Sequence, residues 1–209
     1  MPRSILYIDK KKLLLGVTMV AIFSMCQGQN RTNIWYFGKG AGLDFNTNPP
    51  NALVDGKIDT EEGTATICDS LGQILFYTDG VTVWNKNHDT MQNGFGLFGS
   101  SSSCQSALII KKPLNEYIYY ILTSDHEGGD RGANYSIVDL RLDNGNGGLI
   151  QKNVHLFDVA NERIAGTLHK NGHDVWITCT QNYTNTIYIY LLTETGINFH
   201  QTETLPAGK

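Results

Sequence analysis

Two stretches decide the fold: NIWYFGKGAGLDF at residues 33–45 and EGTATICDSLGQILFYTDGVTVWN at residues 62–85. Both consist of short runs of aromatic and β-branched residues, which favour strands, separated by glycines. The pair Asp79-Gly80 is typical of a tight turn between two antiparallel strands. Period-two alternation of apolar and polar side chains recurs from Gly63 to the C-terminus, and no stretch shows a helical period. The sequence therefore predicts an all-β protein.

The predicted strands fall into three sets: residues 65–68, 74–78 and 81–84; residues 107–111, 117–123, 135–140 and 149–156; and residues 165–168, 175–180, 187–193 and 197–202. The triplets FYT, ILT and TCT, which end at residues 78, 123 and 180, occupy the same place in each set. The triplets ILT and TCT are farther apart than FYT and ILT, by about the length of the glycine-rich loop at residues 125–133. A four-stranded unit that repeats every ~40 to 50 residues is typical of β-propeller blades. A β-sandwich of unrelated hairpins is the alternative.

Three blades do not close a ring, because propellers typically have 4 to 8 blades. Residues 33–37 and 43–45 supply further strands that would complete the last blade of a larger ring. We therefore predict a partial β-propeller of about three four-stranded blades plus N-terminal strands, not a closed ring. This domain spans residues 29–209 and is expected to be a fragment of a larger propeller, whose unpaired edge strands would pair with missing downstream blades.

Residues 1–28 have the three parts of a secretory signal peptide: basic residues at positions 3 and 10–12, an apolar run at 13–23 and a short polar tail. The run is too short for a membrane span, which needs ~20 apolar residues. We expect cleavage after Gly28, with no integral membrane span afterwards. A lipoprotein acylated at Cys26 is less favoured because the bulky Met25 precedes it. The predicted location is secreted or cell-surface.

Charge and cysteine content limit the partners. The 209-residue chain has a net charge of −4, and without the leader 12 Lys and Arg face 19 Asp and Glu, a net charge of −7. This balance argues against nucleic acid or anionic lipid as a partner. Cys68, Cys104 and Cys179 remain, so at most one disulfide could form in an oxidising compartment. No spacing indicates zinc, and no metal or other cofactor is expected.

The strongest candidate for a ligand site is the loop DHEGGDRG at residues 125–132, because loops inserted on a rigid scaffold tend to carry binding residues. Its candidate residues are Asp125, His126, Glu127, Asp130 and Arg131. The segment DTEEG at residues 59–63 adds the candidate Glu62. A mobile surface loop and a solvated acidic turn are the respective alternatives. His169 and His173 have the spacing of a helical metal site, but Asn171-Gly172 between them indicates a hairpin instead.

No catalytic residues are predicted. The serines at 100–103 lack the G-x-S-x-G frame of a nucleophile elbow, and DNGNGG at residues 143–148 lacks the oxygen ligands of a calcium loop. The leading hypothesis is thus a non-catalytic binding or adhesion module. The alternative is a glycan-active hydrolase or lyase, which needs two carboxylates from different blades ~5 to 10 Å apart, such as Glu62 and Asp174. A truncated copy without independent activity is the third possibility.

A family resemblance supports the leading hypothesis. The positions that carry it are WYFG at 35–38, AGLDF at 41–45, EG at 62–63, Asp69, Gly72, LFYTDG at 75–80, VWN at 83–85, His88, Met91, NG at 93–94, GL at 96–97 and SSCQS at 102–106. Here the chain resembles the N-terminal, WD40-like β-propeller region of large secreted proteins of gliding bacteria. In those proteins, PKD modules and a gliding-motility-associated C-terminal sorting domain follow. The resemblance implies export and a scaffold or adhesion role with a surface glycan or protein as partner, and it implies no established catalytic residues.

Overall fold

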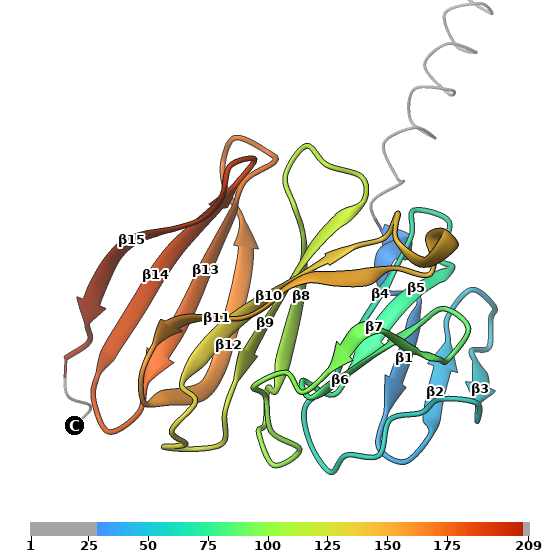
Figure 1. Ribbon diagram of the computed structural model, residues 1–209, viewed down its shortest axis with the longest axis horizontal. Coiled ribbons are helices and arrows are strands. Elements are labelled where there is room, and N and C mark those ends of the chain that lie inside the picture. Colours follow the sequence, from blue (N-terminus) through green and yellow to red (C-terminus); the bar gives the residue numbers. More distant parts are fainter. Residues whose placement is uncertain (1–28, 207–209) are drawn as a thin grey trace, which may run out of the picture.

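The computed structural model describes residues 29–206, so the predicted signal peptide and Cys26 lie outside the described residues. Apart from two short 3₁₀ helices, η1 (Gln29–Thr32) and η2 (Asp143–Gly145), the regular structure of this part is all β (Figure 1). The strands form three sheets. The first has the order β1-β2-β3 and contains β1 (Ile34–Phe37), β2 (Ala41–Asp44) and β3 (Asn51–Leu53).

The second sheet has eight strands and consists of two antiparallel blades. The first blade contains β4 (Ala65–Cys68), β5 (Ile74–Thr78), β6 (Thr82–Asn85) and β7 (Thr90–Phe95). The second contains β8 (Ala107–Lys111), β9 (Ile118–Ser124), β10 (Ala133–Asp139) and β11 (Gly148–Phe157). The outermost strands of the two blades, β7 and β11, run parallel and pair at one position, Gly148 with Gln92. The blades are therefore joined at a single bridge.

The third sheet is the last blade, with the order β12-β13-β14-β15. It contains β12 (Ala160–Leu168), β13 (Val175–Gln181), β14 (Thr186–Thr193) and β15 (Gly196–Thr204). Figure 1 shows the sheets arranged as a fan, in which the first strands of neighbouring blades, β4, β8 and β12, lie next to one another. The prediction of a partial propeller with three four-stranded blades and additional N-terminal strands, without a closed ring, is confirmed, and the sandwich alternative is wrong.

The core is divided into three clusters, each between two neighbouring sheets. Ile34, Tyr36, Cys68 and Tyr77 fill the space between β1–β3 and β4–β7. The middle cluster combines side chains of β4–β7 and β8–β11, among them Phe76, Val83, Met91, Tyr119, Ile121 and Val138. The last combines β8–β11 and β12–β15, among them Tyr120, Leu122, Phe157, Ile177, Cys179, Tyr190 and Leu192. Successive residues of one strand, such as Phe76 and Tyr77, thus enter different clusters, because successive side chains of a strand point to opposite faces.

The structure corrects three details of the strand prediction. β3 and β7 were not predicted, and β7 completes the first blade. The turn at Asp79-Gly80 spans three residues, because β6 begins at Thr82, and only Gly80 has a positive φ, of 88°. The Asp79 carboxylate closes this turn by accepting hydrogen bonds from the amides of Val81 and Thr82. Among residues 29–206, no helix is long and apolar enough to cross a membrane.

Candidate functional site

The loop at residues 125–132 connects β9 to β10 and is organised by one carboxylate. Asp125 is 6% exposed, and its Oδ1 accepts hydrogen bonds from the amide and Nδ1 of His126, each at 2.9 Å. Its Oδ2 accepts a hydrogen bond from the Arg131 amide at 3.2 Å. Gly129 is required because a Cβ there would overlap the Asp125 side chain. The predicted loop is therefore an ordered structure, held from within.

Neighbouring segments also hold this loop. The Glu127 amide donates a hydrogen bond of 2.8 Å to Glu162 Oε1 at the start of β12. On the other side, the Arg131 guanidinium lies over the ring of Phe98, 5.2 Å from its centroid, a distance at which a cation and an aromatic ring attract. Phe98 belongs to the connection between β7 and β8. The loop thus contacts the segment before the second blade and the first strand of the third.

A cavity of about 430 Å³ opens between this loop and the turns of the preceding blade. Its lining residues are Val81, Gly99, Ser100, Ser101, Asp125, His126, Asp130 and Arg131. The far wall is fixed because the Ser106 hydroxyl donates a hydrogen bond of 2.6 Å to the Asp79 carbonyl and accepts one from the Ser100 amide at 3.2 Å. Four of the predicted ligand residues therefore face one cavity, whose size is within the range of small-molecule sites.

The fifth and sixth predicted residues, Glu127 and Glu62, do not line this cavity; both lie close to Glu162. Oxygen atoms of Glu62 and Glu162 and the sulfur of Cys104 lie within 4.8 Å of one another. The three residues precede β4, precede β8 and begin β12, respectively, so three blades contribute to one cluster. Glu127 joins it through its amide rather than its side chain. The six residues predicted from sequence thus lie at the same end of the blades, where the first strands begin: four at the cavity and two beside Glu162.

The electrostatics of the cluster favour an ionised Glu162. Burial opposes ionisation, but hydrogen bonds from the amides of Cys104 and Glu127 outweigh it, and the pKa of Glu162 lies below its usual value. The reverse holds for the thiol: a hydrogen bond to Glu162 and the negative charge of Glu62 raise the pKa of Cys104 above its usual value. A carboxylate held ionised in this way accepts hydrogen bonds or binds a cation, and it is a poor proton donor.

This coupling predicts the reactivity of Cys104. Replacing Glu162 with Gln removes a negative charge beside the thiol, so the pKa of Cys104 should fall and its alkylation by iodoacetamide at pH 8 should accelerate several-fold, because the thiolate is the nucleophile. Mass spectrometry of the alkylated peptide measures the rate. Cys68 and Cys179, which are buried, serve as internal controls and should stay unmodified in the folded protein. An unchanged Cys104 rate would contradict this coupling.

The structure does not bring the other sequence candidates together. Asp174 lies in the β12–β13 hairpin, at the end of β12 opposite Glu162. Its partner His169 is seven positions after Glu162, a rise of roughly 23 Å along an extended strand. Glu62 and Asp174 therefore cannot act as a catalytic pair. His169 and His173 flank the predicted hairpin turn, where the His169 amide bonds the Asp174 carbonyl and Gly172 has a φ of 83°.

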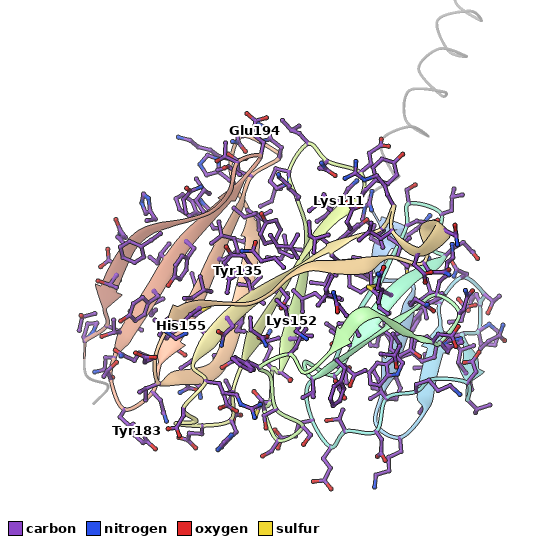
Figure 2. All side chains as sticks on the ribbon, in the orientation of Figure 1. Lys111, Tyr135, Lys152, His155, Tyr183 and Glu194 are labelled. Carbon is purple, nitrogen blue, oxygen red and sulfur yellow. The ribbon has the colours of Figure 1, made fainter. Side chains whose placement is uncertain are left out.

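Sequence reasoning missed several residues of this region. Glu162 and Phe98 carry no local motif, and their roles depend on contacts with distant segments. Tyr183 was also missed; it is 81% exposed in the turn between β13 and β14, and its hydroxyl lies beside Gly128 of the loop. Figure 2 shows Tyr183 at the lower end of the molecule, with Lys111 and Glu194 at the opposite end.

Comparison of the chain with family models, curated proteins and solved structures finds no match.

Proposed function

We propose that this chain is an exported, non-catalytic binding or adhesion module whose ligand is a surface glycan, held in the cavity beside residues 125–132. The observation that carries the proposal is the convergence of Asp125, His126, Asp130 and Arg131 on one cavity. A rigid propeller that presents an ordered loop is suited to recognition, since the scaffold fixes the loop before the ligand arrives.

The chemistry of the cavity favours a polyhydroxylated ligand. Asp130 offers carboxylate acceptors, Arg131 offers guanidinium donors, and the hydroxyls of Ser100 and Ser101 offer both. Sugar hydroxyl groups both donate and accept hydrogen bonds, so they match this mixed lining. The exposed ring of Tyr183, beside the loop, adds an aromatic surface on which the apolar face of a sugar could pack.

Catalysis is the second candidate because Glu62 and Glu162, from different blades, place carboxylate oxygens within 4.8 Å. A glycosidase needs one carboxylic acid of raised pKa to protonate the leaving group. The lowered pKa of Glu162 argues against that role. The pair therefore supports binding better than hydrolysis.

A glycan array probed with the labelled chain tests the proposal. Asp130→Ala and Arg131→Ala should each weaken binding of the recognised glycan by about tenfold or more, because each removes a charged hydrogen-bonding group. His173→Ala, in the β12–β13 hairpin at the opposite end of the neighbouring blade, is the matched control and should bind as the parent does. Equal binding by all variants would remove the cavity from consideration. Release of reducing ends that Glu62→Gln abolishes would instead favour the enzyme.

Export and the resemblance to gliding-motility-associated proteins are part of the same proposal. They rest on the leader pattern of residues 1–28 and on the WYFG and LFYTDG motifs. Expression with the native leader, followed by N-terminal analysis of the product outside the cytoplasm, tests export; a mature chain beginning at Gln29 is expected, and a chain retained inside with its leader would contradict it.

A further inference from the structure

The two end sheets of the fan each present an apolar face with no neighbouring sheet. In β1, Ile34 and Tyr36 enter the core, so alternation places Trp35 and Phe37 on the outer side, where they are 51% and 38% exposed. Trp35 pairs with Leu43 of β2, and its ring centroid lies 4.9 Å from that of Phe45. We call this surface the leading face.

The last blade presents the complementary end. Ile177 and Cys179 of β13 are buried toward the preceding blade, so Trp176 and Thr178 point to the other side. The strand register continues this surface onto β14, where Trp176 pairs with Leu191 and Thr178 with Ile189. We call it the trailing face. Its apolar residues are Trp176, Ile187, Ile189 and Leu191.

Within the chain, neighbouring sheets always pack in one sense. The later side of each sheet contacts the earlier side of the next: Tyr36 against Tyr77, Phe76 against Tyr119, and Tyr120 and Leu122 near Ile177 and Tyr190. The leading and trailing faces are the two members of this series that have no partner among the described residues. The leading face is the earlier side of the first sheet, and the trailing face is the later side of the last blade. The two faces are therefore of the kinds that pack against each other inside the chain.

We propose that a second copy of this chain covers these faces, so that the leading face of each copy packs on the trailing face of the other. This contact is head-to-tail, and such contacts form closed rings when the rotation closes. Each copy contributes four blade-like units, namely β1–β3 and the three four-stranded blades, so two copies supply eight, which is within the 4 to 8 blades of known propellers. The exposed Trp35 and Phe37 are anchors of the kind that dominate association energies.

The proposed ring also bears on ligand binding. Because the blades of both copies would follow one another in the same sense, the two loops at residues 125–132 would lie on the same side of the ring. A surface that displays many copies of the ligand would then be held at two points, which strengthens attachment without new contacts. This consequence depends on the ring, whereas binding by one site does not.

Sedimentation velocity of the purified chain over a concentration series tests the ring. We expect a species of twice the monomer mass, and Trp35→Glu and Ile189→Glu should each shift it to monomer by placing a charge in the apolar contact. Leu71→Glu is the matched control, since Leu71 is 71% exposed in the turn between β4 and β5 and should leave the dimer unchanged. A cooperative thermal melt for each variant confirms that it is folded.

Mixing the two monomeric variants distinguishes head-to-tail packing from other dimers. The intact trailing face of Trp35→Glu can receive the intact leading face of Ile189→Glu, so the mixture should form a heterodimer through one interface. A parent chain that stays monomeric would overturn the proposal, as would assemblies larger than two. Persistence of the Ile189→Glu homodimer would also overturn it, because that result requires two leading faces to meet.

Discussion

Replacing Tyr77 with alanine is expected to lower the free energy of unfolding by about 3–5 kcal/mol, the range for deleting a large aromatic side chain from a core. Tyr77 has no exposed surface, and its ring lies 4.6 Å from Tyr36 and 5.5 Å from Trp84 by centroid distance. Its hydroxyl accepts a hydrogen bond from the Lys57 amide at 3.2 Å and bonds His88 Nδ1 at 2.9 Å. This one side chain therefore joins β1–β3 to the first blade.

Chemical denaturation of the parent, Tyr77→Ala and Tyr77→Phe measures these contributions. Burial raises the pKa of the Tyr77 hydroxyl to about 12, so the hydroxyl stays protonated at neutral pH and can donate to His88. Tyr77→Phe keeps the ring and should lose only about 1–2 kcal/mol, the cost of leaving the Lys57 amide without this acceptor. A loss below about 1 kcal/mol for Tyr77→Ala would mean that the N-terminal sheet is not packed as described.

The second large effect is expected at Asp125. Asp125→Ala should abolish the proposed glycan binding and release the loop, because the side chain supplies both acceptors that fold residues 126–131 back on themselves. We expect faster amide hydrogen exchange at His126 and Arg131, whose N–H groups lose their partner. The free energy of unfolding should fall by about 1–3 kcal/mol, the cost of leaving buried polar groups unpaired.

Asp130→Ala separates this positioning role from ligand contact. Asp130 is exposed and lines the cavity, so its replacement should weaken binding while leaving amide exchange in the loop unchanged. Asp125→Asn is the conservative companion: its carbonyl can still accept from His126, but its amide nitrogen cannot accept from Arg131. Parent-like exchange in Asp125→Ala would show that the neighbouring segments alone order the loop.

Local patterns predicted most of the blades. β9 is a continuous apolar run because both of its sides are buried, whereas β13 alternates because one side of the last blade packs against a neighbouring blade. The pair Asn171-Gly172 correctly predicted the turn between β12 and β13. β7 was missed because its sequence, TMQNGF, contains Gly94 and Asn93, which has a φ of 60°, and neither residue favours a strand. It is a strand because Met91 enters the core and the neighbouring β6 supplies its hydrogen-bonding partners. Such tertiary contacts leave no local signal.

Part of the candidate site was likewise predicted from local sequence, and part depends on tertiary contacts. The loop at residues 125–132 stands out in the sequence because it concentrates charged residues between two strands, and the structure confirms its place between β9 and β10. Glu162 could not be found from sequence, since its partners Cys104 and Glu127 are 58 and 35 residues away. The repeat spacing alone could have indicated this convergence, because Glu62, Cys104 and Glu162 precede or begin the first strands of successive blades.

The single bridge between β7 and β11 has a mechanical consequence. Strand pairing runs within each blade, and among the described residues neighbouring blades share one strand bridge, Gly148 with Gln92; side-chain packing and scattered hydrogen bonds, such as that of Asn153 to the Gly96 carbonyl, supply the other contacts. A force that pulls on the two ends of the chain would act on the blades in series. Each blade would then unfold as a separate unit, so the chain would lengthen in steps under an extending force.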